Sequence, residues 1–149
     1  MTTISVGSDV IVRVDRIYLT LEKAEVTVIA VEGRLLPQFA TNPFRGSIRL
    51  QDVRSFDIDK ATIADHFQAG DIVRAKAIAI GDAKSSFFST IGANYGVVVA
   101  KGPDGEPLVP VDQSHMRTSD NSAVFKRKVA KPVWLTLEEA HSPETTVQN

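Results

Sequence analysis

The sequence predicts an all-β protein, and two observations carry that prediction. Along several short segments, apolar and polar residues alternate with a period of two, and most of the apolar ones are β-branched, as a pleated and half-buried surface favours. Turn signals such as Asn-Pro, Gly-Asp and Pro-Asp-Gly separate these segments. Of the 149 residues, 43% are hydrophobic, which is enough to build the core of an ordinary domain.

Five antiparallel strands are expected in the first two thirds of the chain. In the first strand, Val10, Val12 and Val14 alternate with other residues and therefore share one face. The expected strand ranges are 8–17, 24–32, 45–50, 72–80 and 87–91. The side chains expected to point into the core are Ile11 or Val12, Val26 or Val28, Ile48, Val73 and Phe88.

A short helical piece is expected between the third and fourth strands. Residues 60–67 carry Ile63 and Phe67 at an i, i+4 spacing, which favours one or two turns of helix, and Gly70 ends it. Five strands with a helical piece at this point match the partly open barrel called the OB-fold. Other five-stranded folds share the pattern, so the strands alone do not decide between them.

A smaller β-rich unit is expected after the barrel. Residues 95–101 and 107–111 flank a Gly-Pro-Asp-Gly turn and predict a hairpin, whose second arm contains two prolines and is therefore expected at a sheet edge. Residues 112–123 are polar and predict a loop, and residues 125–132 predict a basic strand. The expected division is a barrel at 6–92, the β-rich unit at 93–135 and a disordered tail at 136–149.

Composition limits the classes of protein to which the chain can belong. Its formal net charge of −1 excludes a protein that coats nucleic acid by overall charge, although a local basic face is still possible. Because it has no cysteine, it can form neither a disulfide nor a thiolate zinc site, which fits an intracellular protein. We find no signal-peptide pattern and no apolar stretch near the ~20 residues of a membrane helix.

Five blocks of sequence carry a family resemblance. They are FRGSIRLQDVR (44–54), GDIVRAKAIAIGDA (70–83), YGVVVAK (95–101), PLVPV (107–111) and KRKVAKP (126–132). In their order and spacing they resemble the S1-domain cap subunits of the eukaryotic RNA exosome, of the type called component one or CSL-four. The resemblance covers about residues 6–132.

This resemblance implies a fold and a role. The fold would be an S1-type OB barrel followed by a small β-rich domain, a degenerate relative of a zinc ribbon without zinc. The role would be that of a non-catalytic subunit without a cofactor, which stabilises a ring of RNase PH-like proteins and guides single-stranded RNA into its pore for 3′–5′ processing and degradation, including that of rRNA. The implied partners are RNA, ring subunits and other cap subunits, in the nucleus with its nucleolus and in the cytoplasm.

Two departures from the family are visible. Family members usually carry another β-rich domain before the S1 domain, whereas here Met1 falls almost at the first strand. Archaeal relatives close the C-terminal domain with a zinc ribbon, but Ser114 and Thr118 stand where some relatives would have cysteines. We therefore expect this domain to be held by packing, with contributions from Tyr95, Val97, Val109, Phe125 and Trp134.

The candidate RNA-binding residues surround the second and third expected strands. An OB-fold binds nucleic acid mainly on this face, where cations meet phosphates and an aromatic ring stacks on bases. The candidates are Lys23, Arg34, Phe44, Arg45, Arg49 and Arg54. Alternatively, the cations are solvated or pair with Asp52 and Glu32, and Phe44 closes one end of the barrel.

A second cationic run is expected to contact RNA phosphate or an acidic patch of a ring subunit, and it comprises Lys126, Arg127, Lys128 and Lys131. The alternative is a strand edge that aids solubility.

No catalytic constellation is apparent. The acidic residues Asp52, Asp57, Asp59 and Asp65 fit turns rather than a metal site. The three histidines are isolated and match no HExxH pattern. The sequence therefore predicts a protein that is not an enzyme, either a cap subunit or a free-standing RNA-binding module.

Overall fold

The computed structural model describes residues 4–36, 44–55, 61–81 and 86–130. Within these ranges, strands dominate and the helical elements are short 3-10 turns. The strands are β1 (Asp9–Tyr18), β2 (Lys23–Val31), β3 (Arg34–Leu35), β4 (Arg45–Arg49), β5 (Ile72–Ala79), β6 (Ser86–Ser89), β7 (Gly96–Val99), β8 (Leu108–Asp112), β9 (His115–Thr118) and β10 (Val124–Lys126). The 3-10 turns are η1 (Leu50–Asp52) and η3 (Ile63–Asp65).

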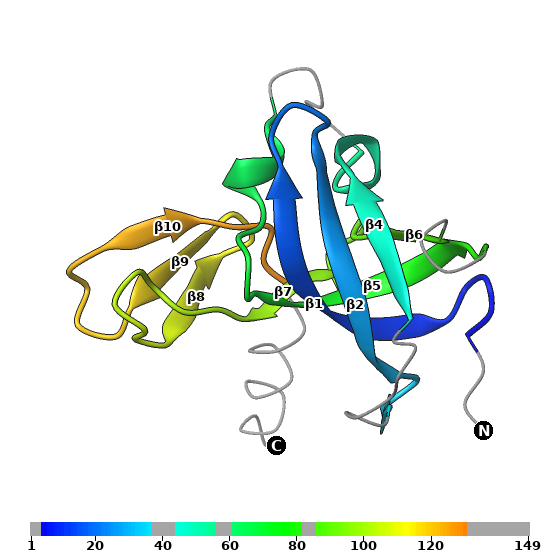
Figure 1. Cartoon of the computed structure of the whole chain (residues 1–149). Coiled ribbons are helices and arrows are strands. Elements are labelled where there is room, and N and C mark those ends of the chain that lie inside the picture. The colour runs from blue at the N-terminus through cyan, green and yellow to red at the C-terminus, as the bar shows by residue number, and fades with distance from the viewer. Residues whose placement is uncertain (1–3, 37–43, 56–60, 82–85, 131–149) are drawn as a thin grey trace.

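Five of the strands close into a barrel (Figure 1). They follow the order β1-β2-β4-β6-β5, and β5 returns to pair with β1. The all-β prediction and the OB-type barrel are confirmed, and the five expected strands agree with the observed ones to within two residues at each end. One detail is wrong: β4 and β6 pair in parallel, through Gly46 and Ser86, so the barrel is not antiparallel throughout.

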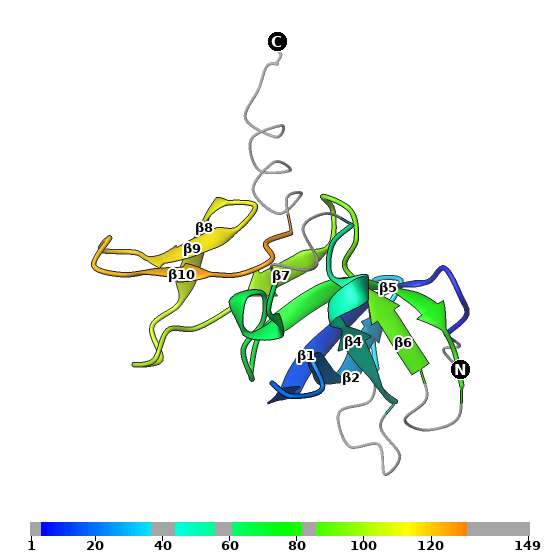
Figure 2. The same cartoon turned by 90° about the horizontal axis from the view of Figure 1, so that it is seen from above.

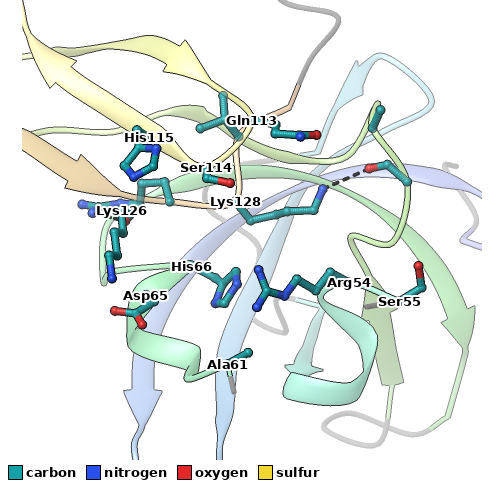
Figure 3. Close-up of a pocket in the computed structure, with 14 residues that line it drawn as sticks. Arg54, Ser55, Ala61, Asp65, His66, Gln113, Ser114, His115, Lys126 and Lys128 are labelled. Atoms are coloured by element: carbon teal, nitrogen blue, oxygen red, sulfur yellow. Dashed lines mark hydrogen bonds between the residues drawn. The ribbon is translucent and has the colours of Figure 1, made fainter. Parts of the chain in front are cut away.

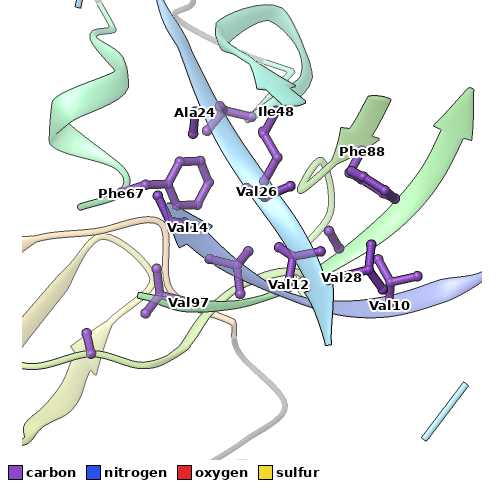
Figure 4. Packing of buried hydrophobic residues seen from close by; sticks show 14 of the residues in the cluster. Val10, Val12, Val14, Ala24, Val26, Val28, Ile48, Phe67, Phe88 and Val97 are labelled. Carbon is purple, nitrogen blue, oxygen red and sulfur yellow. The ribbon is translucent and has the colours of Figure 1, made fainter. Parts of the chain in front are cut away.

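The barrel encloses the main core (Figure 4). Alternation along β1 places Val10, Val12 and Val14 inside, each exposed by 1% or less. The other expected inward side chains are buried as well, and Val12 rather than Ile11 is the inward member of its pair. The expected helical piece is the 3-10 turn η3, and the fully buried Phe67 lies two residues after its end.

A three-stranded sheet with the order β10-β9-β8 lies to one side of the barrel (Figure 2). The expected hairpin forms next to its Gly-Pro-Asp-Gly turn, where Lys101 and Pro107 make an antiparallel bridge. Its arms then separate, because β7 pairs with β5 of the barrel whereas β8 pairs with β9. Since β8 has a partner on only one side, the prediction of an edge strand with prolines is confirmed.

Two expectations for this region are wrong. The segment 112–123, expected to be a loop, contains β9, in which Met116 and Thr118 are buried. Two inward positions between polar turns are too few to reveal the period of a strand. The basic strand expected at 125–132 ends at Lys126, and the following residues instead make single contacts, such as the bridge from Val97 to Val129.

The small sheet shares its apolar contacts with the barrel. Leu108, Met116 and Val129 belong to the same buried cluster as the barrel valines. Of the residues expected to hold this region, Val97 is buried and Phe125 is partly buried against the cluster, whereas the Tyr95 hydroxyl donates to Asp9 Oδ1 at 2.7 Å. Val109 is half-buried, and Trp134 lies outside the described residues. In the described part of the chain, no helix is long and apolar enough to cross a membrane.

Candidate nucleic-acid interface

A row of neighbouring side chains crosses one end of the barrel on its outer face. Tyr18 pairs with Lys23 across β1 and β2, and Lys23 pairs with Arg49 across β2 and β4. Residues directly opposite each other in a sheet project to the same side. Because Ala24 and Ile48, the next residues in register, are fully buried, the row projects outward. The Lys23 ammonium lies 5.5 Å from the centre of the Tyr18 ring, within cation–π range.

Arg49 joins this row to a second aromatic ring. Its guanidinium lies over the ring of Phe87, with 4.1 Å between Cζ and the ring centre. Its Nε donates to Asp52 Oδ2 at 2.7 Å, so that the planar group is fixed from one edge. The Arg49 side chain remains 37% exposed, which leaves part of the guanidinium open to solvent. We refer to Tyr18, Lys23, Arg49 and Phe87 as the outer row.

The turn between β1 and β2 is held beside the outer row by Glu22. This residue has a left-handed backbone with φ of 50°, which is uncommon outside glycine. Its carboxylate accepts the Ile63 N–H at 2.9 Å, and its carbonyl accepts the Leu50 N–H at 3.0 Å. The turn is therefore tied to both η1 and η3, and the positions of Tyr18 and Lys23 are set in advance of any binding.

The expected RNA-binding residues do not all lie together. Lys23 and Arg49 meet in the outer row, but Arg45 begins β4 at the opposite end, about 13 Å away for four residues of strand. Arg34 is exposed in the short β3, beside the far end of β2. Arg54 follows η1 and lines a pocket next to the small sheet. The five candidate cations therefore form one compact pair and three dispersed positions.

Phe44 occupies the place given by the alternative interpretation. It is half-buried and packs edge-to-face against the fully buried Phe88, with ring centres 6.5 Å apart and planes at 67°. Its ring covers one end of the core.

The aromatic residues of the outer row, Tyr18 and Phe87, were not among the candidates that the sequence predicted. For Phe87 a signal existed, because it alternates with the inward Phe88 and must face outward.

The second cationic run separates into different environments. Arg127 is buried, and its Nε donates to the equally buried Asp71 at 2.8 Å, with side chains 6% and 2% exposed. It is therefore unsuited to the surface contact expected of it. Lys126 is exposed, and Lys128 is half-buried with its Nζ donating to the carbonyls of Gly92 and Tyr95. Lys131 lies outside the described residues.

Two titratable groups beside this run are shifted by burial. Desolvation lowers the pKa of Lys128 to about 8. Burial also lowers the pKa of His66, whose Nδ1–H donates to the Thr62 carbonyl at 2.7 Å. Residues 4–36, 44–55, 61–81 and 86–130 contain no group of three or more acidic or histidine side chains arranged to hold a metal ion.

A closed five-stranded barrel with an outer row of this kind places the chain among the OB-fold proteins. A family model described as Exosome component EXOSC1/CSL4 matches residues 38–80. The chain is 36% identical over 130 residues to "Exosome complex component csl4" of Schizosaccharomyces pombe, and the match covers 87% of this chain and 68% of that relative. The chain belongs to the exosome component EXOSC1/CSL4 family.

Two mammalian relatives match a shorter part of the chain. "Exosome complex component CSL4" is 42% identical in Mus musculus and 43% identical in Homo sapiens, over 91 residues in each case. Each match covers 60% of this chain and 47% of the relative. The chain thus spans about two thirds of the fission yeast protein and just under half of the mammalian ones.

Proposed function

We propose that this chain is a non-catalytic cap subunit of the RNA exosome that guides single-stranded RNA along the outer row. In this role it would contact RNase PH-like ring subunits and other cap subunits, and would act in 3′–5′ RNA processing and degradation, including that of rRNA. The proposed locations are the nucleus, with its nucleolus, and the cytoplasm. Membership of the EXOSC1/CSL4 family supports the assembly, and the outer row supports the contact with RNA.

The observation that carries the RNA contact is the stacking of Arg49 on Phe87. Single-stranded nucleic acid is bound by cations that track the phosphates and by flat groups on which bases stack. The outer row combines both, since two neighbouring cations lie between two aromatic rings across adjacent strands. Because phosphate and base faces are common to all sequences, the contact is expected to show little sequence preference.

Two matched phenylalanine substitutions test the contact. Phe87→Ala is expected to weaken RNA binding by about 1–3 kcal/mol, the usual contribution of one stacked base. Phe44→Ala serves as the control, because its ring packs on Phe88 and its loss should lower the melting temperature instead. Binding is measured with the assembled complex and fluorescent single-stranded RNA, together with melting curves. Equal RNA affinities for both variants, with folds intact, would place the RNA path elsewhere.

The charge contribution is tested through salt. Replacing Lys23 and Arg49 with glutamine should flatten the log–log dependence of affinity on salt by about 1.4, at about 0.7 for each phosphate contact on a single strand. Arg45→Gln is the matched control, because Arg45 is exposed at the other end of β4. A slope that changes only in the Arg45 variant would move the path to that end of the barrel.

Assembly is tested by purifying the tagged chain from its own cells. RNase PH-like ring subunits and other cap subunits should be recovered with it in fixed proportion. Recovery of the chain with RNA but without ring subunits would favour a free-standing RNA-binding module instead.

A further inference from the structure

A pocket of about 400 Å³ lies between the barrel and the small sheet (Figure 3). It is lined by five separate stretches of the chain, which lie within residues 54–55, 61–66, 92–93, 113–115 and 126–129. Arg54 and His66 come from the segments around η1 and η3, Gln113 and Ser114 come from the turn between β8 and β9, and the segment 126–129 crosses between them. Neither the barrel nor the sheet alone would make this cavity.

The walls of the pocket are fixed by hydrogen bonds that do not involve a ligand. The buried Arg127–Asp71 ion pair joins the crossing segment to the start of β5. Main-chain N–H groups of residues 127–129 donate to the carbonyls of Ser114, His66 and Gln113 respectively, each at 3.0 Å. A site whose walls are already in place loses little conformational freedom when a ligand binds.

The charge on the pocket is mostly positive. Arg54, Lys126 and Lys128 line it, against the single carboxylate of Asp65. Lys128 donates to two backbone carbonyls, at 3.0 and 2.7 Å, but an ammonium group has three donors and these bonds do not exhaust it. Cations in a concave site with low-dielectric walls concentrate their field, so the pocket favours an anionic group.

The neutral groups of the pocket are both donors and acceptors. Because the Nδ1–H of His66 is bonded to the Thr62 carbonyl, Nε2 carries the lone pair and is an acceptor. The ring lies beside the guanidinium of Arg54 (Figure 3), and its lowered pKa keeps it neutral near pH 7. Gln113 adds an amide with both functions. A carboxylate only accepts hydrogen bonds, whereas a nucleobase edge both donates and accepts, so the lining suits a nucleotide better than an acidic side chain.

The pocket begins one short turn beyond the outer row. Arg49 belongs to the row and Arg54 to the pocket, and only the 3-10 turn η1 and one further residue separate them in the chain. We propose that the pocket holds one nucleotide of the RNA strand that crosses the outer row, with its phosphate among Arg54, Lys126 and Lys128 and its base edge toward His66 and Gln113. This inference rests on the proposed RNA contact and extends it to a second site.

The test compares Lys126→Gln with Lys101→Gln in the assembled complex. Both lysines are exposed, but Lys101 lies at the tip of the hairpin and does not line the pocket. Affinity is measured for single-stranded RNAs of about 4–16 nucleotides, the range of site sizes of one OB barrel. Lys126→Gln is expected to leave the shortest RNAs unaffected and to weaken longer ones by about two- to five-fold, as for an exposed charge contact. Lys101→Gln should match the unchanged protein at every length.

Photo-crosslinking gives a second readout. RNA carrying 4-thiouridine should crosslink to peptides that contain residues 113–115 when the strand is long enough to reach the pocket, and Gln113→Ala should reduce that yield.

If Lys126→Gln has no effect at any length and no crosslink reaches 113–115, whereas Phe87→Ala weakens the binding of every RNA, the pocket proposal fails and the proposed function stands. If Phe87→Ala has no effect, the proposed RNA face fails, and the length-dependent loss in Lys126→Gln decides the pocket by itself. Loss of a ring or cap subunit in Lys126→Gln, with unchanged RNA affinity, would overturn the nucleotide site in favour of an acidic protein contact.

Discussion

The barrel is stabilised by different interactions from those that stabilise the three-stranded sheet beside it. Among the described residues, the two largest fully buried side chains, Phe67 and Phe88, both lie in the barrel, where they pack with the valines of β1 and β2. The sheet formed by β8, β9 and β10 contributes Leu108 and Met116 to the same cluster, and its Phe125 packs against that cluster from the side while partly exposed. The barrel therefore buries its own apolar face, whereas the small sheet depends on contact with the barrel.

Polar and main-chain contacts supply what the small sheet lacks in apolar area. Arg127 forms its buried ion pair with Asp71, at the start of β5, and the main chain of residues 128–130 bonds to Val97 and His66. The sequence predicts that packing holds this region without zinc, and the structure adds these polar contacts to the packing. The comparison shows that a small cysteine-free sheet can be held on a larger neighbour by a few shared apolar contacts together with a buried ion pair and main-chain hydrogen bonds.

The largest expected effect follows from breaking this ion pair. Arg127→Met should lower the free energy of unfolding by about 3–5 kcal/mol, because it leaves the Asp71 carboxylate buried without its partner. Urea unfolding followed by circular dichroism measures the loss. Burial raises the pKa of Asp71 and Arg127 opposes that rise, so without Arg127 the carboxyl should protonate more easily. A folded protein in which a carboxyl group has a raised pKa becomes more stable as the pH falls, because the folded state binds the proton more tightly than the unfolded state does. The variant should therefore recover part of its lost free energy of unfolding toward acidic pH.

The double variant Asp71→Asn with Arg127→Met is the control for this effect. Removing both charges should restore much of the stability, since a buried ion pair often adds little over a neutral pair of similar size. If the double variant is as unstable as Arg127→Met alone, the effect comes from lost packing of the arginine rather than from an unpaired charge.

A middle-sized loss of stability is expected from a glycine-to-alanine substitution, which can be made once in each of the two regions. At Gly46, a Cβ would lie 2.6 Å from the Ser86 carbonyl oxygen, in the parallel pair of β4 and β6. At Gly96, where φ is +140°, a Cβ would lie 2.4 Å from the Lys128 carbonyl oxygen, where the crossing segment meets β7. Each alanine should cost about 1–3 kcal/mol through overpacking.

The two alanine variants should differ in what is lost. Gly46→Ala is expected to weaken hydrogen-exchange protection throughout the barrel, whereas Gly96→Ala should weaken it first in residues 114–130 and leave β1 and β2 protected. Uniform loss of protection in both variants would mean that the barrel and the small sheet unfold as one unit.

The sequence predicted the barrel well because its three longest strands, β1, β2 and β5, carry stretches with a period of two. It failed where the signal was short or non-local: β9 has only four residues, and the partnership of β7 with β5 depends on contacts across more than twenty residues. The parallel closure of β4 on β6 was likewise invisible, since no local pattern distinguishes parallel from antiparallel neighbours in strands of four or five residues.

The candidate site was predicted only in part, because its arrangement also depends on contacts between distant parts of the sequence. Lys23 and Arg49 were identified because they are cations on the expected binding strands, but only the register shows that they are direct neighbours. Charge alone could not separate the exposed Lys126 from the buried Arg127, because the partner of Arg127 is Asp71, 56 residues away in the sequence.

The smallest expected effect, taken per pH unit, concerns Lys128, which lies where the two regions meet. Its pKa is about 8 in the folded chain, against an ordinary value of 10.5, because burial disfavours the charged ammonium. Between these two pH values the unfolded chain binds more protons at this position than the folded chain does. The free energy of unfolding should therefore rise with pH from about 8 toward 10, by at most about 1.4 kcal/mol per pH unit. A neutral amine can still donate to the carbonyls of Gly92 and Tyr95, so the contacts survive the loss of charge.

Because other lysines and the tyrosines also titrate in this range, the measurement is the difference between the unchanged protein and Lys128→Met in urea unfolding at pH 7, 8, 9 and 10. The difference should change little between pH 7 and 8 and should shift in favour of the unchanged protein above pH 8. Parallel stability curves across the whole range would mean that Lys128 is better solvated than its surroundings indicate.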